Sequence, residues 1–128
     1  MSDVIEHWPE MGVTIVHRIG TETASALARC LERLEAGEHW PPSRGLLLDL
    51  RGLLLPAVVA TAGYVTIYTD MLERSGLLRL AVVLALPSQA WLGEALRAAF
   101  PDDTRFRVFS RLPDATQWLL GREYAGEA

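Results

Sequence analysis

The sequence contains no lysine and no asparagine, and all 12 of its basic residues are arginines. Without lysine, the chain is excluded from Schiff-base enzymes, Walker-type phosphate-binding proteins and phospho-receiver domains that need a switch lysine. The arginine bias is accompanied by many alanines and leucines. This composition is typical of biased codon usage and by itself indicates no particular function.

Cysteine is almost absent as well, since Cys30 is the only one. A single cysteine excludes an internal disulfide and favours a reducing compartment. Residues 1–7 contain two acids and neither lysine nor arginine, so they do not have the composition of a signal peptide. We therefore expect a cytoplasmic protein.

The charge balance is slightly acidic, with a formal net charge of −4 at pH 7. Nucleic-acid-binding modules depend on basic residues that neutralise phosphates, so this balance argues against nucleic acid as a partner. Half of the 128 residues are hydrophobic, which suffices for a core without support from metals or disulfides. We expect residues 1–128 to form a single domain.

The longest uncharged stretch runs from Gly52 to Thr69, which is long enough to be considered as a membrane span. Pro56, Gly63, three threonines and two tyrosines interrupt its apolar character. We therefore predict a buried core helix within this stretch and no transmembrane segment.

Alternating apolar runs and helical periodicities predict the element order ββαβαβαβα. The predicted strands are residues 4–8, 13–19, 46–50, 79–86 and 105–109, and the predicted helices are 56–75 and three others that begin at the capping residues Thr21, Ser88 and Ser110. Residues 56–75 also carry β-branched side chains that suit two strands joined at Ala62-Gly63. The position of Pro56 at a helix start favours the helix.

Strands that alternate with helices are typical of parallel βαβ units, and the Pro/Gly connection at residues 9–12 indicates an antiparallel hairpin. We therefore predict a single-domain α/β fold with a mixed, mostly parallel sheet of about five strands and about four helices. The second strand is expected inside the sheet, and the last strand, which alternates charged and apolar residues, near its edge.

Asp49 is the most informative charge, because we predict it one residue before the end of the buried strand Leu46–Leu50, with Arg51 just beyond. In open α/β sheets, ligands gather at the carboxyl ends of strands. The interpretation we favour is that Asp49 bonds backbone amides of the following loop or pairs with Arg51. The alternative is a small enzyme whose strand-end site uses Asp49 and Arg51.

Three aromatic residues, Tyr64, Tyr68 and Trp91, border the predicted central helix and the next strand–helix junction. They line an amphipathic pocket in one interpretation and are half-buried packing residues with wet polar tips in the other. Cys30 is expected to be a buried thiol of a helix. The histidines have no metal-ligand spacing, and common nucleophile and nucleotide motifs are missing. We predict no catalytic residue, metal site or cofactor.

Four segments in order carry a resemblance to a known family. They are the opening hairpin that leads into Gly20-Thr21 and a helix, the run Gly45–Gly52 (GLLLDLRG), the strand Leu80–Leu84 (LAVVL), and the ending Phe106–Leu119 (FRVFSRLPDATQWL). The ending is the most specific, because it contains the pattern F-x-x-x-x-x-A-x-x-W-L. Together these segments resemble the SpoIIAA-like branch of the STAS superfamily (sulphate transporters and anti-sigma-factor antagonists), which is sometimes grouped with Sec14-type lipid-binding domains.

The resemblance implies a small bacterial-type domain that acts by binding, without catalysis. Antagonists of this family carry an Asp-Ser-Ser-Gly phosphorylation switch after the Asp-Leu strand, whereas residues 56–61 here read Pro-Ala-Val-Val-Ala-Thr. Because Thr61 is the only hydroxyl there, we expect no kinase-dependent switch. The prediction is a STAS-like binding domain of unassigned role, for which an apolar ligand and a protein partner both stay open. A homo-oligomer is also compatible with the sequence.

Overall fold

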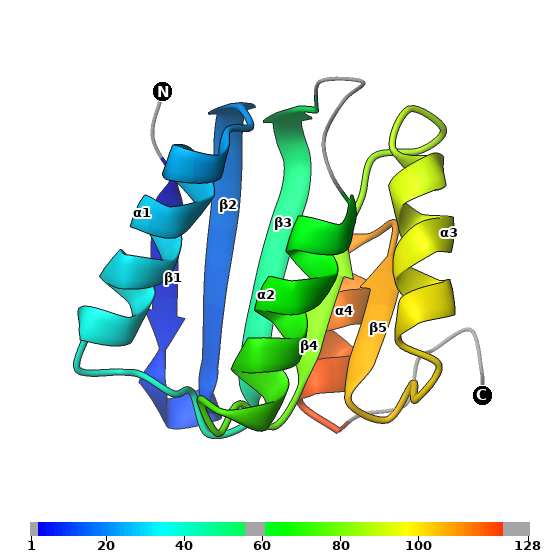
Figure 1. The fold of residues 1–128 in the computed structure, drawn as a ribbon. Coiled ribbons are helices and arrows are strands. Elements are labelled where there is room, and N and C mark those ends of the chain that lie inside the picture. The colour runs from blue at the N-terminus through cyan, green and yellow to red at the C-terminus, as the bar shows by residue number, and fades with distance from the viewer. Residues whose placement is uncertain (1–2, 56–60, 122–128) are drawn as a thin grey trace.

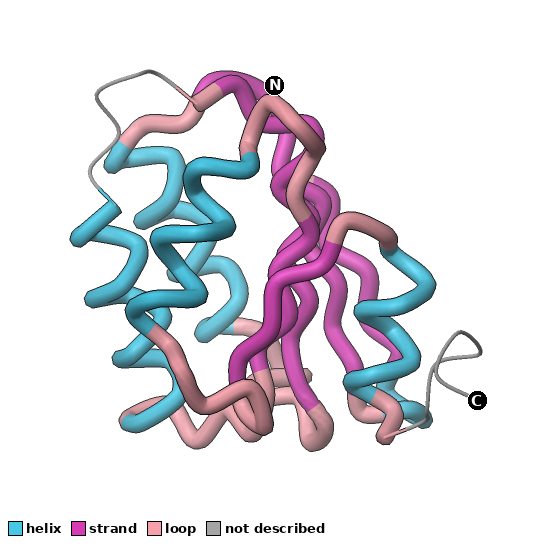
Figure 2. Tube along the Cα trace, turned by 90° about the vertical axis from the view of Figure 1, so that its right-hand side faces the viewer, coloured by secondary structure: helices cyan, strands magenta, loops and turns pink. Residues whose placement is uncertain are grey.

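The computed structural model describes residues 3–55 and 61–121, which fold into one five-stranded sheet with helices on both faces (Figures 1 and 2). The strands are β1 (Val4–Trp8), β2 (Val13–Thr21), β3 (Gly45–Leu54), β4 (Leu80–Val83) and β5 (Phe106–Phe109). The helices are α1 (Ala24–Ala36), α2 (Thr61–Glu73), α3 (Ala90–Ala99) and α4 (Leu112–Leu119), and a 3-10 turn covers Pro9–Met11.

The spatial order of the strands, β1-β2-β3-β4-β5, is their order in the chain. β1 is antiparallel to β2, and every other neighbouring pair is parallel. The predicted ββαβαβαβα order and the mixed, mostly parallel sheet are therefore confirmed. β2 lies inside the sheet and β5 at its edge, also as predicted.

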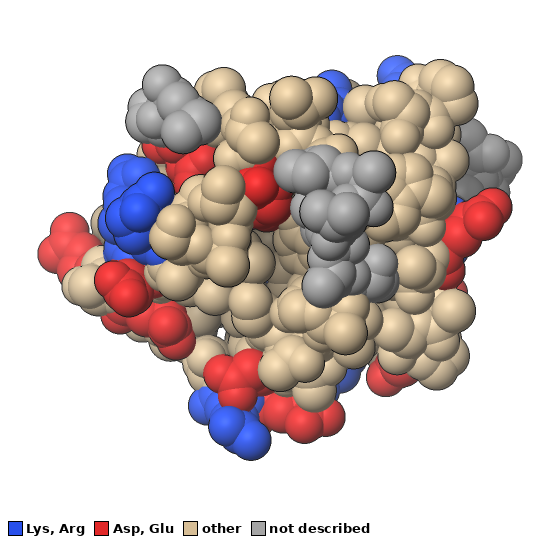
Figure 3. All heavy atoms as spheres, turned by 45° about the horizontal axis from the view of Figure 1, so that its top comes forward, with Lys and Arg blue, Asp and Glu red and all other residues tan. Residues whose placement is uncertain are grey.

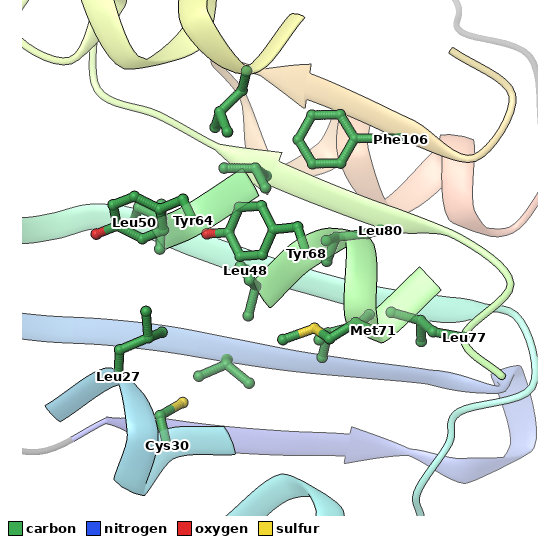
Figure 4. Close-up of a cluster of buried hydrophobic side chains, with 14 of the residues drawn as sticks. Leu27, Cys30, Leu48, Leu50, Tyr64, Tyr68, Met71, Leu77, Leu80 and Phe106 are labelled. Atoms are coloured by element: carbon green, nitrogen blue, oxygen red, sulfur yellow. The ribbon is translucent and has the colours of Figure 1, made fainter. Parts of the chain in front are cut away.

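The sheet separates two apolar layers, because successive side chains of a strand point to opposite faces. One layer lies under α1, α2 and α3, where Leu48, Leu50, Tyr64 and Tyr68 are buried together (Figure 4). The other, smaller layer lies under α4, which packs against β3, β4 and β5 (Figure 2). Both layers are made of aliphatic and aromatic side chains, and the larger one also contains Cys30 and Met71.

The C-terminal end of α4 is held by two arginines at the start of the strands it covers. The Arg79 guanidinium donates to the carbonyl of Trp118 (2.8 Å), and Arg44 donates to that of Leu120 (2.9 Å). The last carbonyls of a helix have no partner within the helix, and cations are stabilising there. Arg79 also lies 5.1 Å from the centre of the Trp118 ring.

Three of the predicted helix caps are wrong. β2 continues through Thr21, and the N-cap of α1 is Thr23, whose hydroxyl accepts the Ala26 N–H (3.0 Å). The helices predicted to begin at Ser88 and Ser110 begin after Gln89 and Arg111 instead, and neither residue makes a side-chain cap bond. The sequence places the caps by residue type, whereas at α1 the extension of β2 through Thr21 moves the cap to Thr23.

The strand predicted over residues 79–86 is shorter in the structure, since β4 ends at Val83. The reason lies in Gln89, which is buried. Its amide oxygen accepts the Ala85 N–H (2.8 Å), and its amide nitrogen donates to the carbonyls of Leu50 and Leu53. The loop after β4 is thus tied to β3 by a side chain, and the parallel ladder ends.

The choice of a helix for residues 56–75 is confirmed for 61–73, while 56–60 lie outside the described residues. Buried side chains recur along α2 at helical spacing, namely Tyr64, Tyr68, Met71 and Leu72. Gly52–Leu54 belong to β3 and not to a helix. Of the helices in the part of the chain that is described, none is long and apolar enough to cross a membrane.

Candidate functional site

The five residues predicted to form a site lie in three places. Asp49 and Arg51 are on the face of the sheet that α4 partly covers, because Asp49 alternates with the core residues Leu48 and Leu50. Tyr64 and Tyr68 are buried on the opposite face. Trp91, 42% exposed, lies at the start of α3. The structure therefore does not gather these residues into a single site.

The prediction that Asp49 lies at the end of its strand is wrong, because β3 continues to Leu54. The register between β2 and β3 shifts at this point. His17 pairs with Asp49, but Ile19 pairs with Gly52, so β3 contains one residue more than β2 there. Such a bulge leaves an extra residue outside the ladder. The Arg51 N–H is satisfied by Asp49 Oδ1 (3.2 Å).

Asp49 is the centre of a row of polar side chains that crosses three strands, which we call the Asp49 cluster (Glu6, His17, Asp49 and Arg51). Arg51 Nε and Nη2 donate to Asp49 at 2.8 and 3.0 Å. His17 lies between two acids, with Nδ1 2.9 Å from Asp49 and Nε2 2.6 Å from Glu6. The expected Asp49–Arg51 pair is therefore present, and both oxygens of Asp49 are engaged.

The contacts in the Asp49 cluster favour its charged forms. Partial burial alone would lower the pKa of His17, but its hydrogen bonds to Asp49 and Glu6 outweigh burial and raise the pKa above 6.5. Burial alone would raise the pKa of Asp49, but hydrogen bonds from Arg51 and His17 lower it below 3.8. The cluster is thus an ion network held by hydrogen bonds, without a free base or nucleophile at its centre.

The raised pKa of His17 predicts a loss of stability in mildly alkaline solution. The stabilisation is complete below pH 6.5 and is lost as the pH rises through the folded-state pKa of His17, because the unfolded state binds fewer protons than the folded state over this interval. We expect a loss of up to about 1 kcal/mol in the free energy of unfolding, limited by solvent screening of the half-exposed cluster. Urea titrations between pH 6 and 9 measure it.

The variant His17→Gln should show a flatter pH dependence than the wild type over this range. His7→Gln is the matched control, because burial, with repulsion from His39, lowers the pKa of His7. The stabilisation linked to His7 is lost as the pH falls. At higher pH, the free energy of unfolding of His7→Gln should therefore fall as much as that of the wild type. An unchanged alkaline loss in His17→Gln would contradict the assignment.

A second polar group is buried on the opposite face, and we call it the Arg18 cluster (Asp3, Arg18, Glu22 and Tyr64). Arg18 is only 2% exposed. Its Nη1 and Nη2 atoms donate to both oxygens of Glu22 at 2.6 and 2.9 Å, a bidentate pair. The Tyr64 hydroxyl also donates to Glu22. The buried charges are therefore paired with each other near the carboxyl end of β2.

Three neutral groups lie in or beside the Arg18 cluster, namely its own member Tyr64 and the neighbouring Tyr68 and Cys30. Burial, and then the hydrogen bond to Glu22, raises the pKa of Tyr64, and burial raises the pKa of Tyr68. Burial also raises the pKa of the Cys30 thiol to about 11, so this cysteine is an inert core residue, as predicted. The rings of Tyr64 and Tyr68 follow each other along α2 with centroids 5.7 Å apart (Figure 4).

The two tyrosines give a matched pair for mutation. The Tyr68 hydroxyl is buried and has no hydrogen-bond partner among the described residues, so Tyr68→Phe should leave the free energy of unfolding unchanged or raise it by about 1 kcal/mol. Tyr64→Phe removes a bond to a charged acceptor and should cost about 1.5–3 kcal/mol. Urea unfolding of both variants checks the difference, and a larger loss in Tyr68→Phe would contradict it.

A groove of about 460 Å³ lies between α1 and α2. Figure 1 shows these two helices beside each other on the same face of the sheet. The apolar lining of the groove comes from α1, α2 and the loop after α1, and consists of Leu31, Trp40, Val65, Ile67 and Met71. Tyr68 lies below this groove in the core, and neither Asp49 nor Trp91 lines it.

Sequence reasoning missed several of these residues. His17, Glu6 and Asp49 come from three different strands, so nothing in their spacing predicts the contact. Arg18 has a recognisable pattern, since it follows Thr14 and Val16 on the inward-facing side of β2 and has an acid four residues later. An inward-facing arginine with a nearby acid indicates a buried ion pair.

No protein-family model and no curated protein sequence matches this chain. One similar solved structure is an uncharacterised protein of the DUF3478 family with a SpoIIAA-like fold, from Shewanella loihica PV-4. It is 20% identical, with a TM-score of 0.57, and the match covers 92% of this chain and 94% of that one. The chain has a SpoIIAA-like fold. The fold suggested by the resemblance of the four sequence segments is therefore confirmed.

In this SpoIIAA-like domain, the segment after β3 is where the antagonists of the resembled family carry their switch. Residues 56–60 lie outside the described part of the chain, and α2 includes Thr61 as its first described residue. The expectation that no kinase acts here stays a prediction. It is tested by incubation with partner-switching kinases, which should leave the protein mass unchanged.

Proposed function

We propose that residues 1–128 act as one non-catalytic, STAS-like, cytoplasmic binding domain that takes an amphipathic segment of a partner protein into the α1–α2 groove. The observation that carries this proposal is the apolar lining of the groove. Leu31 from α1 and Val65 and Ile67 from α2 are only partly buried, so they leave apolar surface that a partner would cover. A groove between two helices is a common place for a partner helix to dock.

The charges around the groove favour a basic partner. Glu35, Asp70 and Glu73 line it together with a single arginine, Arg74. Arg74 pairs with Asp70 (3.1 Å), so it neutralises one of the three acids and leaves a negative surplus. A partner helix with an apolar stripe flanked by arginine or lysine would complement both the lining and this charge.

Two other functions receive less support. A small apolar ligand is usually enclosed on most of its surface by apolar side chains, whereas Glu35, Asp70, Glu73 and Arg74 also line this groove. The alternative of an enzyme that uses Asp49 and Arg51 needs groups that are available for chemistry. Asp49 accepts hydrogen bonds from Arg51 and His17 with both oxygens, so the geometry does not favour it.

The proposal is tested with a designed helical peptide that has leucines on one face and arginines beside them. We expect saturable binding, followed through the change in tryptophan fluorescence to which Trp40 in the groove contributes, and at least a tenfold loss of affinity in Val65→Arg. Leu78→Arg is the matched control, because Leu78 is an exposed leucine outside the groove, and its affinity should be unchanged.

Two results would overturn this proposal. One is equal peptide affinity of Val65→Arg and the wild type, which would place the binding surface elsewhere. The other is the absence of peptide binding together with saturable palmitate binding that Val65→Arg abolishes, which would assign the groove to a small apolar ligand. Circular dichroism of each variant establishes that it is folded before binding is measured.

A further inference from the structure

A second, smaller hollow of about 180 Å³ lies on the other flank of α1, away from the groove. Helical spacing places Leu31 and Glu35 on the groove side of α1 and Arg29 and Arg33 on the opposite side. The wall facing α1 comes from β2 and from the residue before β1, and it includes Arg18 and Asp3. Three arginines therefore line a hollow in a protein whose net charge is negative. Figure 3 shows a basic patch on the α1 side of the molecule, with acidic side chains around it.

One acid, Asp3, occupies part of this hollow with long hydrogen bonds. Its Oδ1 accepts the Ile19 backbone N–H at 3.3 Å, and its Oδ2 accepts Arg18 Nε at 3.4 Å. Both lengths are beyond the usual range for N–H donors to oxygen, and charge-assisted bonds are normally shorter. The backbone amide and the Nε–H of a buried guanidinium thus form a fixed pair of anion donors that Asp3 satisfies weakly.

The two arginines of α1 add charge that nothing in the described part of the chain neutralises. Arg29 and Arg33 are exposed and one helical turn apart, and no carboxylate among residues 3–55 and 61–121 lies within ion-pair distance of either. Glu32 stands between them in the sequence but pairs with neither. Glu22 accepts hydrogen bonds from the other two nitrogens of Arg18, Nη1 and Nη2.

We infer that this hollow is a phosphate-binding site in which the carboxylate of Asp3 is an internal competitor. The Asp3 carboxylate bonds the Ile19 N–H and Arg18 Nε and makes no ion pair with Arg29 or Arg33. A phosphate group carries more charge and has oxygens in several directions, so it engages all four donors at once. The inference is independent of the proposed function, because this hollow and the α1–α2 groove share no lining residue.

The experiment is a titration of the full chain with inorganic phosphate, followed by nuclear magnetic resonance in a buffer of low chloride concentration. We expect saturable shifts of the Ile19 amide and of the arginine Nε–H groups. Asp3→Asn should bind several-fold more tightly, because the competing charge is removed. The double variant Arg29→Gln, Arg33→Gln should bind at least about tenfold more weakly, since charge-assisted bonds are lost. Arg74→Gln, an arginine on α2, is the matched control and should bind like the wild type.

Acetate and glycerol 3-phosphate are titrated in parallel to separate the sources of the anion. Acetate should bind more weakly than phosphate, and glycerol 3-phosphate at least as well as phosphate if the natural ligand is a phosphate monoester. Equal affinity for acetate and phosphate would overturn the assignment to phosphate. The site itself would be overturned if neither the wild type nor Asp3→Asn showed saturable shifts, or if the double arginine variant kept its affinity.

Discussion

Replacing Arg18 by methionine is expected to lower the free energy of unfolding by about 3–5 kcal/mol, because it leaves a buried charge without its partner. Glu22 is 6% exposed, and it would retain only the hydrogen bond from Tyr64. A carboxylate in such surroundings must either be desolvated at high cost or become protonated. Urea unfolding of Arg18→Met at pH 7 measures the loss.

Two further variants separate this effect from a simple loss of packing. The triple variant Arg18→Met, Glu22→Leu, Tyr64→Phe replaces the buried polar groups by apolar ones of similar size and should recover most of the stability. Arg74→Met removes the exposed pair with Asp70 and should change the free energy of unfolding by less than about 1 kcal/mol. A loss in Arg18→Met no greater than in Arg74→Met would show that Arg18 is not the partner of a buried charge.

Gly45→Ala is expected to destabilise the protein by about 2–5 kcal/mol, through backbone strain and overpacking together. Gly45 has a φ of +155°, and a Cβ atom there would lie 2.6 Å from the carbonyl oxygen of Arg79 and 2.7 Å from Leu119 Cδ2. The Arg79 carbonyl accepts the Leu46 N–H (3.0 Å), so it cannot move away without breaking this hydrogen bond between β3 and the residue before β4. The last turn of α4 would also have to shift, because Leu119 belongs to its apolar layer.

Gly63→Ala is the matched control with the opposite expected sign. Gly63 is exposed within α2, and no atom outside the helix lies within 4 Å of a Cβ built there. Alanine in a helix is more stable than glycine by about 0.5–1 kcal/mol. Thermal unfolding should therefore show a lower midpoint for Gly45→Ala and a higher one for Gly63→Ala. A shift of the same sign in both variants would contradict the role of Gly45.

The order of the elements could be predicted because it depends on local patterns. The apolar run Leu46–Leu50, for example, predicts a buried strand without knowledge of its neighbours, and the spacing of Leu27 and Leu34 predicts a helix face. The pairing of Asp49 with Arg51 was equally accessible, since the two residues are neighbours in the chain. Element ends were less accessible, because the ladder of one strand determines where the next helix starts, as Thr21 and Thr23 show.

The sequence by itself determined the SpoIIAA-like order of strands and helices, the buried Cys30 and the local Asp49–Arg51 pair. Only the tertiary structure decided that β3 bulges past Asp49, that His17 lies between Glu6 and Asp49, and that Arg18 is buried against Glu22 and Tyr64. The physical reason is the distance along the chain. The hydrophobic periodicity of a segment indicates which of its sides faces the core. The contacts named above depend instead on the register between strands and on which helix covers which face of the sheet. No single segment encodes this register or this placement of the helices.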